Sequence, residues 1–288
     1  MQSVLSPRGP AAAEIAELSS VLIAGGAAIF FLVIAALACA VWSRPPWLAR
    51  ERFVVAAGVV FPVVVLSILL LYVYRVGARL HEQPATQFRI EVTAGQWWWR
   101  VRYPGFETAN EIRVPAGQPV ELVLLSADVI HSFWVPNLAG KVDMIPGRAN
   151  RLVITAMKEG VYRGQCAEFC GGPHALMALH VVAQSAHEFE IWKANQLQVA
   201  ASDHALFNAR CGACHSVRGT EAAGTRGPDL THVASRLHLG AGTLANTPAA
   251  MSAWLADSQH VKPGSLMPAM RLGAAELESL AAYLSTLK

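Results

Sequence analysis

Two long stretches of this sequence lack charge. Leu18–Ser43 and Phe53–Tyr74 contain no Asp, Glu, Lys or Arg. A helix rises about 1.5 Å per residue, so each stretch is long enough to cross the roughly 30 Å hydrocarbon layer of a membrane. Arginines flank both stretches, and 53% of all residues are hydrophobic, more than soluble folds usually need. The absence of charge therefore predicts a two-helix transmembrane hairpin over residues 1–80.

The first uncharged stretch has a competing interpretation as a signal peptide. It is long for the apolar part of a signal, and a second stretch follows closely. Removal of a separate leader stays open. Arg44, Arg50 and Arg52 lie between the stretches, so the positive-inside rule predicts a cytoplasmic loop with both termini on the other side. Pro62 is expected to kink the second helix.

The rest of the chain has no excess of either charge. Residues 1–80 hold six Lys and Arg against three acids, and residues 81–288 hold seventeen of each sign. The formal net charge of +3 therefore belongs to the predicted anchor. This distribution disfavours nucleic acid as a partner.

Cysteine is also scarce, and no obvious pair is available for a structural disulfide. Of five cysteines, Cys39 lies in the first uncharged stretch, and the others form two close pairs, Cys166 with Cys170 and Cys211 with Cys214. An exported domain without a spare cysteine pair suggests that its thiols bind cofactors. Internal repeats and low-complexity segments are absent as well.

After the anchor, short β-rich segments separated by turn residues predict a compact sandwich in residues 81–184. Ser185 and Glu188 match a capping box that opens a helix in a linker over residues 185–200. The β-rich segments are 88–93, 97–103, 111–114, 120–126, 151–156, 160–166 and 176–183.

The last part of the chain, residues 201–288, has a helical pattern. Ser202 is expected to cap a helix that runs into Cys211, and Thr247 followed by a proline predicts the start of another. Apolar residues at three- and four-residue steps predict a final helix with one buried face. These residues are Leu277, Leu280, Ala281, Leu284 and Leu287.

The first cysteine pair belongs to a cluster of soft metal donors. The thiols of Cys166 and Cys170, the imidazole of His174 and the thioether of Met177 fall within twelve residues. Such donors favour copper over hard ions, and two thiolates can bridge two metals. His131 is a candidate for a second imidazole from a neighbouring strand end. Taken alone, the cysteine pair also fits a disulfide or half of a zinc site.

This stretch resembles the dinuclear CuA site of cytochrome c oxidase subunit II, and the resemblance covers nearly all of residues 1–190. It implies a cupredoxin-like β-barrel in which the Glu168 backbone carbonyl is a weak ligand, and the Glu168 carboxylate helps to hold magnesium at the junction with subunit I. Trp97 resembles the residue that admits electrons, although an aromatic cluster that fills the barrel is the alternative. The implied side-chain copper ligands are His131, Cys166, Cys170, His174 and Met177.

The second cysteine pair matches the attachment signature of a c-type haem. In Cys211-Gly-Ala-Cys214-His215, two thioethers hold the porphyrin and the imidazole reaches the iron. A redox-active or zinc-binding pair is the alternative. Met267 resembles the distal ligand of class I cytochromes c, with Met270 as the second candidate. Candidates for a haem propionate are His232, Ser235 and Arg236, and His232 is also a weaker candidate for the axial position.

Together these features resemble oxidases that carry their own haem c. They imply a multidomain membrane protein with a two-helix transmembrane hairpin, a cupredoxin-like β-barrel and an all-α class I cytochrome c domain. The implied place is the bacterial inner membrane, with both cofactor domains in the periplasm.

The implied function is that of the electron-transfer subunit of a cytochrome c oxidase. Electrons from cytochrome c or a similar donor would pass through haem c and CuA to subunit I, for reduction of oxygen to water coupled to proton pumping. Subunit III is a further expected partner. The sequence offers no acid–base or nucleophilic pair of its own. The alternatives are the same role in a nitric oxide reductase and a membrane-tethered copper carrier; a quinol oxidase subunit is disfavoured, because that branch lacks the copper ligands.

Overall fold

The computed structural model describes residues 2–81, 84–86 and 88–288. They form two compact units, one from residues 11–83 and the other from residues 1–10 and 84–288. The predicted start of the sandwich domain, at residue 81, adjoins residues 82 and 83, which lie outside the described residues.

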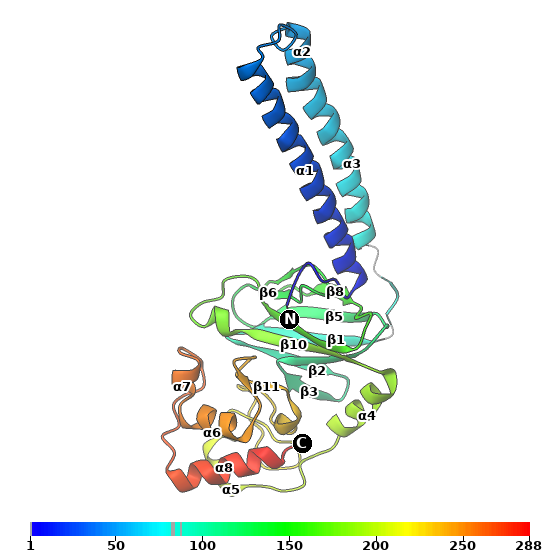
Figure 1. The fold of residues 1–288 in the computed structure, drawn as a ribbon. Helices are drawn as coiled ribbons and strands as arrows, with labels where there is room; N and C mark the ends of the chain where they lie inside the picture. The colour runs from blue at the N-terminus through cyan, green and yellow to red at the C-terminus, as the bar shows by residue number, and fades with distance from the viewer. Residues whose placement is uncertain (1, 82–83, 87) are drawn as a thin grey trace. The chain divides into compact units, whose positions relative to one another are not determined.

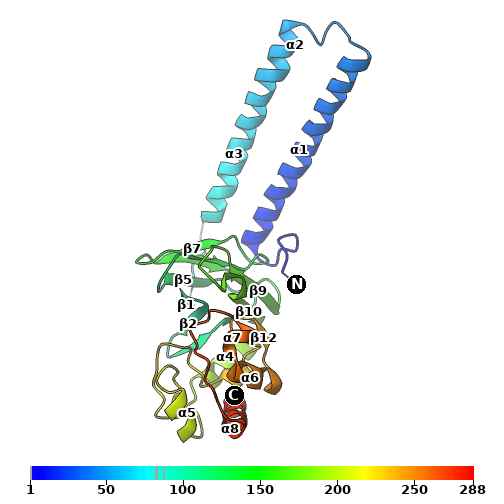
Figure 2. The ribbon, with the colours of Figure 1, turned by 90° about the vertical axis from the view of Figure 1, so that its left-hand side faces the viewer.

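The smaller unit is a hairpin of two long apolar helices, which lie side by side in both views (Figures 1 and 2). Each is long and apolar enough to cross a membrane. An ion pair between Arg79 and Glu14, 2.8 Å from Nη2 to Oε2, joins the two helices. A π-helical turn ends at Val60, two residues before Pro62. The proline nitrogen has no N–H to donate to the preceding turn, so the helix widens there. The elements are α1 (Pro10–Trp42), α2 (Glu51–Val55), the π-helical turn (Ala56–Val60) and α3 (Phe61–His81).

The next part of the chain is a β-sandwich of two five-stranded sheets, called the sandwich below. The first sheet has the order β3-β2-β1-β5-β8 and the second the order β4-β10-β9-β6-β7. The first contains β1 (Arg89–Gly95), β2 (Trp98–Tyr103), β3 (Phe106–Ala109), β5 (Val120–Ser126) and β8 (Asn150–Ile154). The second contains β4 (Glu111–Pro115), β6 (His131–Trp134), β7 (Val142–Met144), β9 (Gly160–Cys166) and β10 (Ala178–Gln184).

Alternating burial along the strands builds the sandwich core. In β1, Ile90, Val92 and Ala94 are fully buried while their neighbours are partly exposed, as the two-residue period of a strand requires. All seven predicted segments form strands. Sequence reasoning missed β3, β6 and β7, which have only three or four residues and show little alternation.

A short helix, α4 (Ala186–Gln196), follows the sandwich. Its capping box is confirmed, because the Ser185 hydroxyl accepts from the Glu188 backbone N–H and the Glu188 carboxylate accepts from the Ser185 N–H.

Residues 201–288 form a small helical domain, called the C-terminal domain below. The predicted cap at Ser202 is wrong: α5 begins later, and the His204 ring accepts from the backbone N–H of Phe207. The helix start at Thr247 is confirmed, and the predicted face of the last helix packs into the domain core. The helices are α5 (Ala205–Arg210), α6 (Pro248–Ala256), α7 (Ser258–Val261) and α8 (Ala274–Thr286), with two paired two-residue strands, β11 (His238–Leu239) and β12 (Leu244–Ala245).

Candidate metal centre and cofactor pocket

The ends of two paired strands bring a histidine to two cysteines. His131 begins β6 and Cys166 ends β9, and these strands pair through Phe133 opposite Cys166. One donor atom from each of His131, Cys166 and Cys170 lies within 4.8 Å of the others. All three residues are buried.

The other predicted donors border the same cluster. The Cys170 sulfur lies 3.4 Å from Nδ1 of His174 and 3.9 Å from the Met177 sulfur. The Cys166 sulfur lies 3.2 Å from the Glu168 carbonyl oxygen. The chain therefore brings together all six residues that the sequence singled out for copper.

The chemistry of this donor set fits copper. Both thiols are free, with 3.8 Å between their sulfurs, so the disulfide alternative does not describe this structure. A buried thioether beside two thiols and two imidazoles is a soft donor set, which suits copper better than magnesium or calcium.

The pKa values of the two thiols are shifted in opposite directions. Burial acts to raise the pKa of Cys166, but hydrogen bonds with His131 and with backbone groups of Glu168 and Ser132 hold it below its ordinary value. Burial and the neighbouring Cys166 raise the pKa of Cys170 to about 12. The contacts with His131 and the backbone therefore favour the thiolate of Cys166, the form of a cysteine that binds metal.

Asp128 orients the histidine, and sequence reasoning missed it. Its Oδ1 lies 2.8 Å from Nε2 of His131. A carboxylate only accepts, so the proton sits on Nε2 and the lone pair of Nδ1 faces the Cys166 sulfur at 3.8 Å. Burial acts to lower the pKa of His131, but Cys166 and Asp128 raise it overall. An acid three residues before a candidate ligand was the available signal.

The Glu168 carboxylate, by contrast, pairs with a lysine. Its Oε2 lies 3.2 Å from the Lys141 ammonium, which also contacts Asp143 at 3.1 Å. The magnesium role expected for Glu168 stays a prediction.

The haem signature lines a cavity of about 530 Å³ in the larger unit, which contains the sandwich and the C-terminal domain. Cys211, Cys214, His215 and Met267 all border it, together with apolar side chains that include Trp254. Met270 is not among the described residues that line it. A largely apolar cavity with two thiols, an imidazole and a thioether fits a covalently bound haem.

His215, the candidate axial ligand, is held in one orientation. Its Nδ1 donates to the Pro228 carbonyl oxygen at 2.9 Å, which leaves Nε2 free for a metal. Burial lowers the pKa of His215, so the imidazole stays neutral, as a ligand must. Gly227 lies against this ring, and a Cβ there would come within 2.5 Å of its Cε1.

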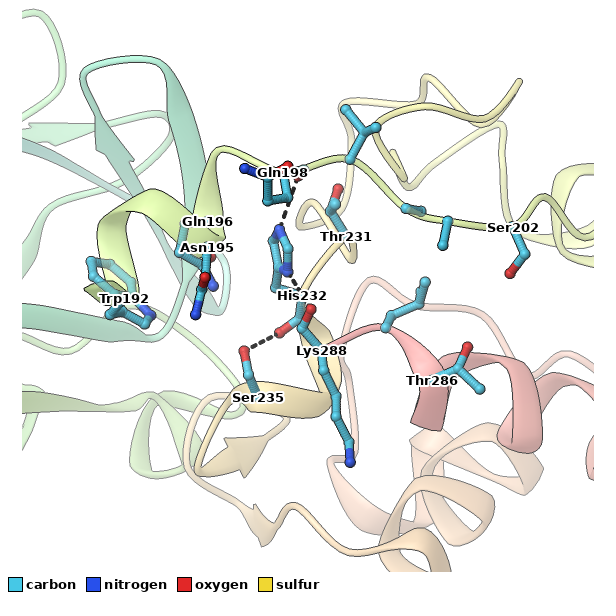
Figure 3. A pocket seen from close by; sticks show the side chains of 14 residues that line it. Trp192, Asn195, Gln196, Gln198, Ser202, Thr231, His232, Ser235, Thr286 and Lys288 are labelled. Carbon is cyan, nitrogen blue, oxygen red and sulfur yellow. Dashed lines mark hydrogen bonds between the residues drawn. The ribbon is translucent and has the colours of Figure 1, made fainter. Parts of the chain in front are cut away.

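The three candidates for binding a haem propionate lie in two different pockets. Arg236 borders the haem cavity and is buried, with an Nε that has no partner within the described residues. His232 and Ser235 line a second pocket, in which the His232 ring lies between the carbonyl oxygens of Gln198 and Lys288 (Figure 3). The structure therefore favours Arg236 and does not bring His232 to the haem cavity.

Trp97 lies between the two candidate sites. Its side chain borders the haem cavity, and its Nε1 donates to the Cys170 carbonyl oxygen at 3.0 Å. Gln96 donates to the same oxygen at 2.8 Å. Two more tryptophans follow Trp97 directly, and the second of them, Trp99, fills the sandwich core against Phe133, as the alternative interpretation expected.

Comparison with known families assigns both domains. Residues 102–185 match the family model described as the periplasmic domain of cytochrome c oxidase subunit II, and residues 204–288 match the model described as cytochrome c. The chain thus contains a cupredoxin-like subunit II domain followed by a cytochrome c domain, behind two apolar helices.

Curated relatives with the name cytochrome c oxidase subunit 2 agree with this assignment. The protein of Alkalihalophilus pseudofirmus is 37% identical over 211 residues, covering 69% of this chain and 61% of the relative. That of Bacillus subtilis is 36% identical, covering 69% and 62%. The chain thus spans about three fifths of the length of these relatives. The solved periplasmic domain of cytochrome oxidase subunit II of Bradyrhizobium japonicum is 34% identical, with a TM-score of 0.38, covering 39% of this chain and 95% of that one.

Proposed function

We propose that this chain, with its subunit II and cytochrome c domains, is the subunit through which electrons enter a haem–copper terminal oxidase. Electrons from cytochrome c or a similar donor would pass through haem c and dinuclear CuA to subunit I, where oxygen is reduced to water with proton pumping. The observation that carries the proposal is the presence, in one compact unit, of a buried soft-donor cluster and a cavity lined by the haem signature.

The proposal assigns each donor a role. The Glu168 carbonyl would be a weak copper ligand, Cys211 and Cys214 would hold the haem through thioethers, and His215 and Met267 would bind its iron. When bound, the copper pair and the haem supply one-electron redox chemistry. The side chains that would hold the two coppers are His131, Cys166, Cys170, His174 and Met177.

The protein's own part is to position these groups and to keep water away. Asp128 holds His131 in the tautomer that presents Nδ1, and the Pro228 carbonyl does the equivalent for His215. Burial of Cys166, Cys170 and Met177 keeps water away from the sulfur donors proposed for copper.

The proposed setting is the bacterial inner membrane. The two apolar helices would cross it, with the arginine-rich loop in the cytoplasm and both cofactor domains in the periplasm. Subunit I would be the electron acceptor and subunit III a further partner, and magnesium at Glu168 would lie at the junction with subunit I.

Two measurements separate this function from its rivals. The purified complex should consume oxygen when a reduced donor is supplied, and Cys170→Ser should abolish that uptake while leaving covalent haem in place. Consumption of nitric oxide without oxygen uptake would favour the nitric oxide reductase. Copper that exchanges freely into a chelator, in a chain without covalent haem, would favour the copper carrier.

A further inference from the structure

The C-terminal domain is bonded to the sandwich at several points within one compact unit. Backbone groups join β10 to the segment after β11, since the Ala178 N–H donates to the Ala241 carbonyl oxygen at 2.9 Å. The Leu237 N–H donates to the Glu111 carboxylate at 2.8 Å. The rings of His180 and His238 stack with centroids 4.1 Å apart. These contacts form an interface between the C-terminal domain and the sandwich.

Lys262 belongs to this interface and also borders the haem cavity. It follows α7, and only 3% of its surface is exposed. Its ammonium group donates to the Trp97 carbonyl oxygen at 2.7 Å and to the Gly240 carbonyl oxygen at 3.1 Å. One side chain of the C-terminal domain therefore bonds the peptide that carries the sandwich tryptophan.

The setting of Lys262 is unusual for a lysine. Within the described part of the chain no carboxylate pairs with it; burial lowers its pKa to about 7, and the charge of the nearby Cys170 acts in the opposite direction. A buried ammonium without a counter-ion is costly, and methionine or leucine would fill the same space more cheaply. What the lysine supplies that an apolar residue lacks is the pair of hydrogen bonds, one to each domain.

From Trp97 the bonded path continues to the copper cluster. The Trp97 indole donates to the Cys170 carbonyl oxygen at 3.0 Å, and a Cβ at Gly171 would come within 3.1 Å of the indole. Lys262, Trp97 and Cys170 thus form an unbroken series of hydrogen bonds and covalent bonds from the haem cavity to a thiol.

We infer that Lys262 is a positioning residue that fixes the C-terminal domain on the Trp97 peptide, so that the electrons entering the copper site at Trp97 come from this chain's own haem. The inference rests on the proposed function and specifies the contact that such transfer uses. In the step itself one electron leaves ferrous haem, which becomes ferric, and reduces the oxidised copper pair by one electron. No proton or bond changes place.

The test is the rate of electron transfer between haem and copper in the intact complex. A light pulse with a photoreductant reduces the haem, and the absorbance of each centre follows the electron. Lys262→Met should slow transfer by roughly tenfold, within the range that small misplacements of reacting groups cost. Lys262→Arg, which keeps charged donors, should restore part of the rate. Lys158→Met removes the same charge from an exposed loop of the sandwich and should transfer at the wild-type rate.

Two further readouts separate positioning from other effects. Redox titration of the haem and the copper pair in each variant shows whether the driving force has changed, and a slower rate at unchanged potentials supports positioning. If Lys262→Met does not mature, Lys262→Gln serves in its place, because its side chain is one bond shorter and fails to reach both carbonyls.

The outcomes distinguish the inference from the function. Wild-type rates in Lys262→Met and Lys262→Gln, with both centres loaded, would overturn the role of Lys262 and leave the function intact. A slower rate that follows only from shifted potentials would also overturn it. Absence of any transfer from haem to copper in the wild-type complex would instead remove the proposed function.

Discussion

Asp128 allows a quantitative test of how the copper ligands are held. Its two carboxylate oxygens have separate partners: Oδ1 accepts from Nε2 of His131 at 2.8 Å and from the Val129 backbone N–H at 2.7 Å, and Oδ2 accepts from the Gln96 backbone N–H at 2.6 Å. Asparagine has nearly the same shape but only one oxygen. In Asp128→Asn, the amide NH₂ must therefore face either the His131 and Val129 donors or the Gln96 N–H, and the His131 ring loses its fixed tautomer or the Gln96 loop shifts.

The expected loss of copper affinity can be taken from other proteins in which a residue that orients a ligating histidine was changed. Loss of a partner that orients a ligating histidine typically lowers metal affinity about 10- to 100-fold, or about 1.4 to 2.7 kcal/mol. His131 is fully buried but the Asp128 side chain is 30% exposed, so the loss is expected anywhere within this range.

Competition with a chelator measures this affinity directly. The copper-loaded chain is titrated with a chelator of known affinity, and copper retention is followed by the absorption of the thiolate-bound metal. Glu159→Gln, in an exposed loop of the same domain, is the matched control and should bind as the wild type does. Wild-type affinity in Asp128→Asn, within about twofold, would refute the orienting role, since it would lie outside the range typical of such partners.

Two further predictions concern the fold around the sites. Burial and the neighbouring His238 lower the pKa of His180 from 6.5 to about 4, so the folded chain resists its protonation. Its effect on stability is absent above pH 6.5 and grows into a loss of at most about 3 kcal/mol as the pH falls to 4. As the pH is lowered from 7 to 5, the midpoint temperature of unfolding should therefore decrease more steeply in the wild type than in His180→Gln. Equal slopes in the two proteins would contradict this. In Gly227→Ala, the added Cβ crowds the His215 ring and should disturb the haem absorption spectrum, whereas Gly172→Ala, whose Cβ meets nothing within 4 Å, should not; identical spectra would count against the axial role of His215.

Local patterns made much of this structure predictable. The capping box at Ser185 and the helix start at Thr247 depend on neighbours in sequence, and both were predicted correctly. The same holds for the donor spacing between Cys166 and Met177, because a short loop can hardly separate these side chains. At α5, however, a histidine ring took the place of the expected Ser202 cap, since the helix begins two residues later than the pattern suggested.

Long-range partners were beyond such patterns. Lys262 meets the Trp97 carbonyl across 165 residues of sequence, and nothing in its own neighbourhood marks it as buried. Asp128 precedes His131 by three residues, but only the turn between β5 and β6 directs its carboxylate at the ring. Three short strands were also missed, because their pairing rather than their composition makes them strands.

The central claim is that two thiolates of one chain bridge a pair of coppers beside a covalent haem. Metal analysis combined with electron paramagnetic resonance of the matured full-length chain tests it most directly. The account predicts two coppers and one covalent haem per chain, with the unpaired spin shared equally by both copper nuclei. A single copper with its spin on one nucleus, or zinc in its place, would contradict it.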